Sequence, residues 1–100
     1  MLVHTVLFWM KKGSPRSAAR RLADECRTYL RTPSVRHLWA GPPAGTGARD
    51  VIDATYDVGL TVVFDDVKGH DAYQVHPRHK SFIARNHKRW LRVTVMDVQA

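Results

Sequence analysis

The first residues of the chain, Leu2 to Met10, are apolar at almost every position. They are rich in β-branched and aromatic side chains, which favours a strand over a helix. Alternate side chains of a strand point to opposite faces. One set is Leu2, His4, Val6 and Phe8, and the other is Val3, Thr5, Leu7 and Trp9. Because both sets are largely apolar, the strand must be covered on both faces, and few folds of 100 residues do that.

A helix is predicted to follow this strand. Ser14 and Pro15 have the residue types of an N-cap and a first helical position, and Pro33 marks the end. Between them, apolar residues recur at steps of three and four and form one stripe, with the arginines outside it. The stripe consists of Ala18, Leu22, Cys26, Tyr29 and Leu30.

Two further strands are expected in the middle of the chain. Residues 35–40 alternate and predict a short strand, and the Gly- and Pro-rich segment 41–47 predicts a loop. A third strand is predicted from an unbroken alternation. Its core-facing residues are Tyr56, Val58, Leu60, Val62 and Phe64, with Asp57, Gly59 and Thr61 on the other face.

The last third of the chain predicts a bent helical region and a final strand. Asp65 and Asp66 place carboxylates at the start of a helix over 67–74. Pro77 disfavours helical backbone at the residue before it, so we expect a kink there and a second helical segment to about His87. Residues 90–98 alternate as a fourth strand.

The resulting βαββαβ order predicts an α+β, ferredoxin-like fold: one four-stranded antiparallel sheet with the helices on one face. The length fits a single domain over residues 1–100. The other sheet face is then bare in the single chain. We therefore expect a homodimer, a dimeric α/β barrel in which a second copy covers that face and encloses a cavity.

The chain is basic, with a formal charge of +7 at pH 7. The basic residues are spread along the two helical regions, and no nucleic-acid-binding motif accompanies them. We interpret them as solvated helix faces that attract anionic ligands, and we do not expect a nucleic-acid partner. Cys26 is the only cysteine, so an intrachain disulfide or a cysteine-based zinc cluster is excluded, and we expect it in the core.

No membrane-spanning or leader segment is expected. The apolar run from Val6 to Met10 is far too short to cross a bilayer and lacks the basic lead and cleavage site of a signal peptide. We therefore expect a cytoplasmic protein that does not associate with a membrane.

Several segments resemble the stress-responsive dimeric α/β barrel family. They are His4-Thr5-Val6-Leu7-Phe8, the two aspartates before the second helical region, Ala72-Tyr73-Gln74-Val75-His76-Pro77-Arg78-His79, and Val95-Met96-Asp97. They span nearly the whole chain in the expected order. The most specific element is Tyr73 followed by the HPxxH string that ends at His79. The resemblance implies the same dimeric barrel.

Within that family the chain resembles proteins of the olivetolic acid cyclase type, which are plant polyketide cyclases. That resemblance implies His79 as the acid/base, Tyr73 as its assistant and His4 as a pocket residue. We expect no cofactor and no metal. Histidine suits proton transfer near neutral pH. A further pocket histidine of those cyclases falls at Val58 in this chain, so the specific cyclisation is not expected to carry over.

Two functional interpretations follow. In the first, His79 takes a proton beside a carbonyl of a small anionic or phenolic ligand, Tyr73 donates a hydrogen bond to the developing oxyanion and His4 orients the ligand, as in a cofactor-independent lyase, cyclase or isomerase. In the second, the chain is a non-catalytic dimeric stress-response or ligand-binding module, and the same residues are structural.

Two weaker interpretations concern other residues. His76 and His79 are three residues apart with His70 nearby, a spacing that a metal ion can use, but no third ligand or outer shell is identifiable. The tryptophans Trp9, Trp39 and Trp90 could line a pocket for a planar ligand, but such residues are more often core, and packing explains them without a ligand.

Overall fold

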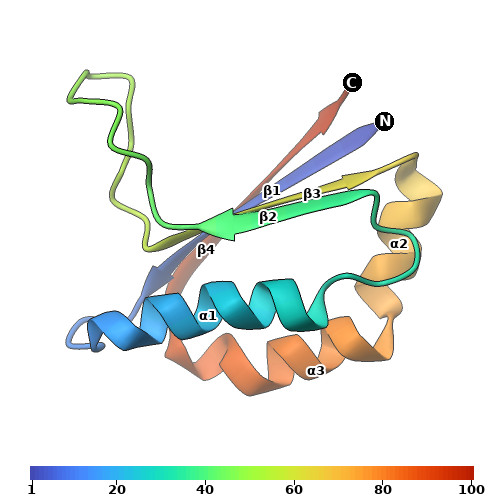
Figure 1. The fold of residues 1–100 in the computed structure, drawn as a ribbon, viewed down its shortest axis with the longest axis horizontal. Coiled ribbons are helices and arrows are strands. Elements are labelled where there is room, and N and C mark those ends of the chain that lie inside the picture. The colour runs from blue at the N-terminus through green and yellow to red at the C-terminus, as the bar shows by residue number, and fades with distance from the viewer.

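The computed structural model describes residues 1–100, and it confirms the ferredoxin-like α+β fold (Figure 1). The elements are β1 (Leu2–Met10), α1 (Arg16–Tyr29), β2 (His37–Gly41), β3 (Val58–Phe64), α2 (Val67–Val75), α3 (Pro77–Asn86), a 3-10 turn (His87–Arg89) and β4 (Trp90–Gln99). The strands form one antiparallel sheet in the order β2-β3-β1-β4. The predicted second helical region is thus two helices, α2 and α3, which meet at a bend.

All three helices lie on one face of the sheet, with α1 and α3 side by side and α2 at one end (Figure 1). On β1, every second residue from Leu2 to Met10 is buried beneath them. Leu22 and Cys26 of α1, with Leu30 directly after it, fill the space above the strand, each at most 1 % exposed. A buried aliphatic side chain of this size contributes about 1.5–3 kcal/mol to folding. This layer therefore supplies the core, and Cys26 belongs to it as expected.

The opposite sheet face carries large apolar side chains without any helix over them (Figure 1). Strand pairing places Met96 beside Thr5 and Val98 beside Val3 on this face, and both β4 residues are 58 % exposed. Trp39 of β2 is 59 % exposed. We call this surface the open face, and it agrees with the sequence expectation that the helices cover only one side.

The helix α1 begins one residue later than predicted. Pro15 has extended backbone (φ −67°, ψ 154°) and occupies the N-cap position, so Ser14 is not the cap. The hydroxyl of Ser14 instead donates to the carbonyl of Lys11 over 2.5 Å and closes the turn after β1. Gly13 has a φ of 84° in this turn, a conformation that glycine adopts without strain. Ser14 therefore belongs to the turn and does not cap the helix.

The connection between β2 and β3 is longer than predicted, covering residues 42–57, and it extends beyond the sheet (Figure 1). Tyr56 is not a core residue of β3: its ring packs edge to face against Trp9, which projects toward the open face. Tyr56 lies outside β3 because the next residue, Asp57, is bound to the end of β1. Its N–H donates to the carbonyl of Phe8 over 2.8 Å and its carboxylate accepts from the N–H of Met10 over 2.7 Å.

One ion pair ties the two long helices together. The guanidinium of Arg85 on α3 lies 2.6 Å from the carboxylate of Glu25 on α1, and Arg21 approaches the same carboxylate at 3.4 Å. Glu25 is 8 % exposed, so these partners compensate the cost of burying its charge. No helix of the chain is long and apolar enough to cross a membrane.

Candidate functional site

A cavity of about 140 Å³ lies between the covered face of the sheet and helices α2 and α3. Thirteen residues line it and ten of them are hydrophobic; the other three are His4, Gln74 and His79. Tyr73 is one of the hydrophobic ten. All three residues singled out from the sequence therefore line one cavity. That cavity lies on the helix side of the sheet. The expected cavity of the dimeric barrel would instead lie on the opposite side, between the sheets of the two copies.

The bend between α2 and α3 brings Tyr73 and His79 together. His76 has extended backbone (ψ 139°), and Pro77 follows as the first residue of α3. The His76 Nδ1 atom accepts a hydrogen bond from the N–H of Arg78 over 3.1 Å, so this ring caps α3. Across the bend, the rings of Tyr73 and His79 meet edge to face with centroids 4.6 Å apart.

Tyr73 is 1 % exposed, and its ring packs against Phe64 of β3 with centroids 5.0 Å apart. Burial raises the pKa of Tyr73 above its usual value, and the nearby Cys26 adds to this. The hydroxyl has no hydrogen-bond partner within the protein. It therefore remains a protonated donor beside the cavity.

The two cavity histidines are neutral at physiological pH. Burial lowers the pKa of His79, and the neighbouring His4 and His70 lower it further. Burial also lowers the pKa of His4, against the opposing effect of its hydrogen bond to Asp97. A neutral imidazole can accept a proton, so His79 has the protonation state that a general base needs.

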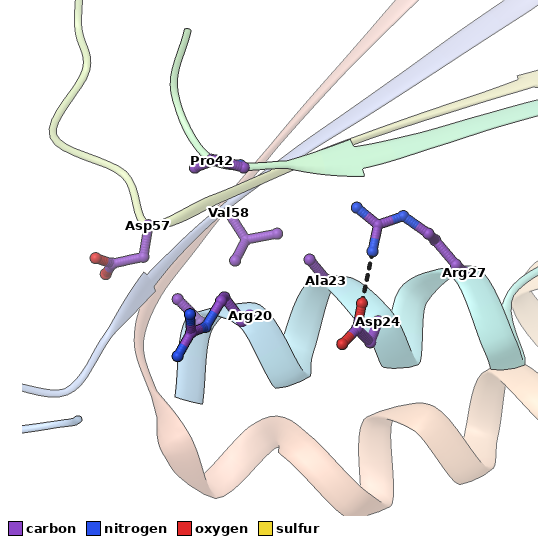
Figure 2. A pocket seen from close by; sticks show the side chains of 8 residues that line it. Arg20, Ala23, Asp24, Arg27, Pro42, Asp57 and Val58 are labelled. Atoms are coloured by element: carbon purple, nitrogen blue, oxygen red, sulfur yellow. Dashed lines mark hydrogen bonds and ion pairs between the residues drawn. The ribbon is translucent and has the colours of Figure 1, made fainter. Parts of the chain in front are cut away.

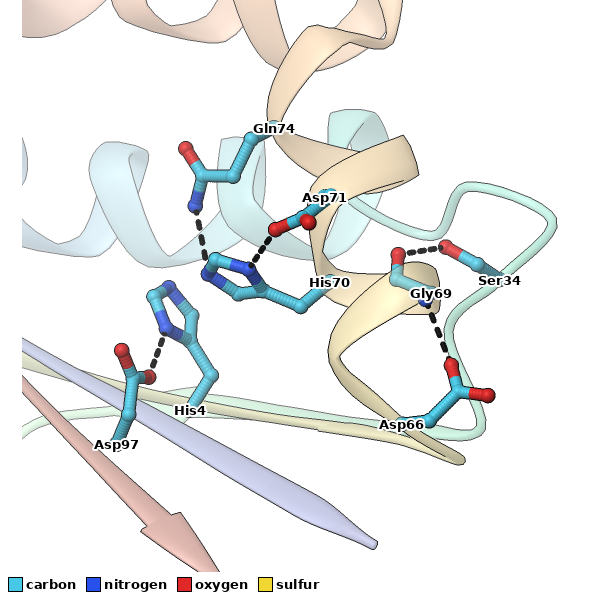
Figure 3. A network of polar contacts seen from close by, with 8 residues as sticks. All are labelled: His4, Ser34, Asp66, Gly69, His70, Asp71, Gln74 and Asp97. Carbon is cyan, nitrogen blue, oxygen red and sulfur yellow. Dashed lines mark hydrogen bonds and ion pairs between the residues drawn. The ribbon is translucent and has the colours of Figure 1, made fainter.

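Two histidine–carboxylate pairs lie beside the cavity, and of their four residues only His4 lines it (Figure 3). The Nδ1 atom of His4 is 2.5 Å from the Asp97 carboxylate on β4, because β1 and β4 pair in register at these two residues. His70 of α2 lies over the other side of the His4 ring, with centroids 5.1 Å apart, and its Nδ1 is 3.0 Å from the Asp71 carboxylate.

Sequence reasoning placed His70 with His76 and His79, and it assigned no role to Asp97. In the structure His76 caps a helix away from this group, and His70 instead contacts His4. The spacing along the chain could not show this, since the contact joins β1 to α2. Asp97 could be recognised only from its position opposite His4 in the pairing of β1 with β4, and the sequence alone does not determine the register of that pairing.

The three tryptophans do not form one site. Trp90 lines the cavity and packs on Phe8, and its buried indole N–H has no partner. Trp9 donates to the hydroxyl of Thr55 over 2.9 Å, and Trp39 stacks on His37 at the other edge of the sheet. The interpretation of a shared aromatic pocket is therefore wrong.

A second hollow, of about 280 Å³, lies between α1 and the ends of β2 and β3 (Figure 2). Three of its four charged residues are engaged in ordinary surface contacts. The Arg27 guanidinium donates to Asp24 over 2.8 Å and to the carbonyl of Ala40 over 2.6 Å, and Asp57 holds the end of β1. It contains neither a histidine nor a buried acid or base, so the cavity at His79 is the candidate site.

Comparisons with known proteins agree with this fold. Residues 2–100 match the model of the stress responsive A/B barrel domain family. A dimeric ferredoxin-like protein of unknown function from Thermobifida fusca is 18 % identical, with a TM-score of 0.81 over 99 % of this chain and 90 % of that chain. A protein of the same family from Mesorhizobium loti is 22 % identical, with a TM-score of 0.80 over 99 % and 95 % of the two chains.

A hydroxynitrile lyase from Passiflora edulis is 13 % identical, with a TM-score of 0.79 over 97 % of this chain and 90 % of that chain. No curated protein matches the sequence. At these identities the solved structures show a shared fold and nothing more about chemistry. The match of the family model extends from the first strand to the last residue, and the chain therefore belongs to the stress responsive A/B barrel domain family.

Proposed function

We propose that this chain forms a homodimer whose protomers each bind a small carbonyl-bearing, anionic or phenolic molecule and move a proton on it, with His79 as the acid/base. The observation that carries the proposal is the meeting of a neutral imidazole and a protonated phenol in one mostly apolar cavity. Such chemistry belongs to lyases, cyclases and isomerases that need no cofactor.

The cavity size restricts the ligand. Its volume of about 140 Å³ is close to the roughly 150 Å³ of an engineered apolar cavity that takes up benzene. The ring of one aromatic molecule therefore fits between the apolar lining residues. A carbonyl or phenolic oxygen on that ring would have within the cavity the polar groups of four residues, which are His4, Tyr73, Gln74 and His79.

The proposed step is a proton transfer. The free imidazole nitrogen of His79 takes a proton from the carbon beside the carbonyl, and the electron pair of that C–H bond moves to the carbonyl oxygen. Tyr73 donates a hydrogen bond to the oxyanion, and His4, held by Asp97, orients the ligand. The imidazolium of His79 then returns the proton to the product.

A second interpretation is that the cavity only binds. Val58 stands where the related cyclases have another pocket histidine, and its side chain is buried and apolar. The site then has fewer proton-transferring groups than a cyclase pocket. In that case the chain is a non-catalytic ligand-binding or stress-response module with the same residues in structural roles.

The dimer part of the proposal rests on the open face. Trp39, Met96 and Val98 are each more than half exposed there, and a sheet face with large exposed apolar side chains marks an interaction site. A second copy of the chain is the natural cover, because the same apolar face on two molecules is self-complementary. The solved relative from Thermobifida fusca is dimeric, which supports the same assembly here.

Hydrogen–deuterium exchange at carbon tests the chemistry directly. One-ring hydroxyaryl ketones are incubated with the protein in D2O, and loss of the proton beside the carbonyl is followed by NMR. We expect wild-type protein to accelerate exchange and His79→Gln to lose about 10²–10⁴-fold of that acceleration. The matched control is His87→Gln, which alters an exposed histidine that does not line this cavity and is hydrogen-bonded to the carbonyl of Ile83.

Ligand-induced shifts of protein resonances are measured in the same samples. Binding by the wild type without any accelerated exchange would establish the binding module and refute the catalytic proposal. Exchange that survives in His79→Gln would refute the role of His79.

A further inference from the structure

We propose that His4, His70 and Asp97 together bind a divalent transition-metal ion, with Zn²⁺ as the ion that suits them best. The three residues come from three different elements, β1, α2 and β4. Two imidazoles and one carboxylate form a donor set that Zn²⁺ and its neighbours in the first transition row accept.

The distances allow one ion to reach all three groups. Each residue offers one ligand atom, and these atoms all lie within 4.8 Å of one another. Around a zinc ion with bonds of about 2.0–2.2 Å, ligand atoms lie roughly 3.3–3.5 Å apart. The ligand atoms therefore need to move by only about 1 Å to reach these separations, a shift that side-chain rotation can supply.

The surroundings of His70 orient it as a ligand (Figure 3). Its Nδ1 atom is 3.0 Å from the Asp71 carboxylate, which fixes the proton on that nitrogen and leaves Nε2 with a free lone pair. The one group on Nε2 is the side-chain amide of Gln74, at a long 3.4 Å that an ion displaces at little cost. A carboxylate behind a histidine is the usual outer shell of a metal site.

Burial at the site is graded from inside to outside. His4 is 3 % exposed, the side chain of His70 is 19 % exposed and that of Asp97 is 42 % exposed. An ion can therefore enter from the Asp97 side, while His4 connects it to the cavity. Three protein ligands leave one coordination position open, as at catalytic rather than structural zinc sites.

This inference goes beyond the proposed function and does not depend on it. His4 and Asp97 belong to both proposals, but neither His79 nor Tyr73 is among the ligands, so metal binding and proton transfer can each fail alone. The metal measurement below also needs no organic ligand and no turnover.

Metal titration of the 100-residue chain tests the proposal. The protein is stripped with EDTA, exchanged into metal-free buffer at pH 7.5 and titrated with Zn²⁺ by calorimetry, and with Co²⁺ while visible absorption is recorded. We expect one ion per chain and the visible bands of a Co²⁺ site with four or five ligands. His70→Ala is expected to weaken binding by at least about tenfold, and Asp97→Asn likewise.

The control is His87→Ala, an exposed histidine that lies outside the ligand set, and it is expected to bind as the wild type does. Circular dichroism in EDTA verifies that each variant is folded, and His70→Gln replaces His70→Ala if the latter unfolds. Absence of the one-per-chain site in the wild type would overturn the proposal. So would equal affinities of the wild type and the folded His70 variant.

Discussion

The ring of Tyr73 meets that of His79 edge to face at 4.6 Å although a helix bend separates the two residues along the chain. The backbone of His76 and the ring of Pro77 create this contact, because together they stop α2 and start α3 in a new direction. A short proline-containing sequence thus joins two polar groups that a continuous helix would hold apart.

Tyr73→Phe is expected to leave the fold nearly as stable as before. The hydroxyl has no partner in the protein, so its removal changes the free energy of unfolding by less than about 1 kcal/mol. Tyr73→Ala removes the buried ring and is expected to cost about 3–5 kcal/mol. Urea unfolding of both variants measures the difference. A loss of several kcal/mol in Tyr73→Phe would reveal an internal hydrogen bond that this structure lacks.

Stability is expected to fall as the pH drops below 6.5. The pKa values of His4 and His79 are lowered from the ordinary value of 6.5, mainly by burial. Between pH 6.5 and the lower folded-state pKa values, the unfolded chain binds more protons than the folded chain, so acid favours unfolding. Each histidine contributes at most about 1.4 kcal/mol per pH unit.

Urea unfolding at pH 7.5 and pH 5.5, with EDTA present, measures this slope. His79→Gln removes one of the two groups and is expected to give a shallower dependence. A slope that is the same in the variant and the wild type would show that His79 is not among the groups responsible.

The thiol of Cys26 is expected to resist modification in the folded protein. It is fully buried between α1 and the sheet, and burial raises its pKa to about 12. Thiol reagents attack the thiolate, so reaction requires unfolding. Ellman's reagent at pH 8 should react at once in urea and only slowly in buffer. Equally fast reaction in buffer would contradict the packing of α1.

Asp66 is expected to stabilise the start of α2. Its carboxylate accepts a hydrogen bond from the N–H of Gly69 over 2.8 Å. Asp66→Ala should lower the free energy of unfolding by about 1 kcal/mol, whereas Asp66→Asn, which can accept the same bond, should stay close to wild type. Thermal unfolding distinguishes the two. Equal losses would show that charge rather than capping is responsible.

A charge on the open face is expected to separate the dimer. Met96→Glu places a carboxylate on an apolar surface, where an unpaired buried charge is costly. Sedimentation should show a dimer for the wild type and a folded single chain for this variant. Val75→Glu, at an exposed position on α2, should remain dimeric. A stable, well-folded wild-type monomer at high concentration would refute the assembly.

Local patterns predicted most of the fold. The alternation over 2–10 fixed β1 at its observed bounds, and Pro77 marked the bend. The errors lie where a tertiary contact competes with a local preference. Ser14 looked like a helix cap but closes a turn, and Tyr56 continued an alternation but follows Asp57, which is bound to β1.

The candidate site was predictable only in part. A resemblance to known motifs pointed to His4, Tyr73 and His79, and the structure places all three around one cavity. His70 and Asp97 could not be predicted from the sequence, because their contacts with His4 depend on how α2 crosses the sheet and on the register of β4. The sequence also did not predict on which side of the sheet the cavity lies.

The pairing of β1 with β4 also brings the two ends of this chain together. The amino group of Met1 donates to the carbonyl of Ala100 over 2.8 Å. A brief glycine linker could therefore join these ends, and new ends could be opened in the exposed segment 42–57, which no strand pairing uses. Such a circular permutant would start with β3 and would carry His79, Asp97 and His4 in that order, with every strand neighbour retained.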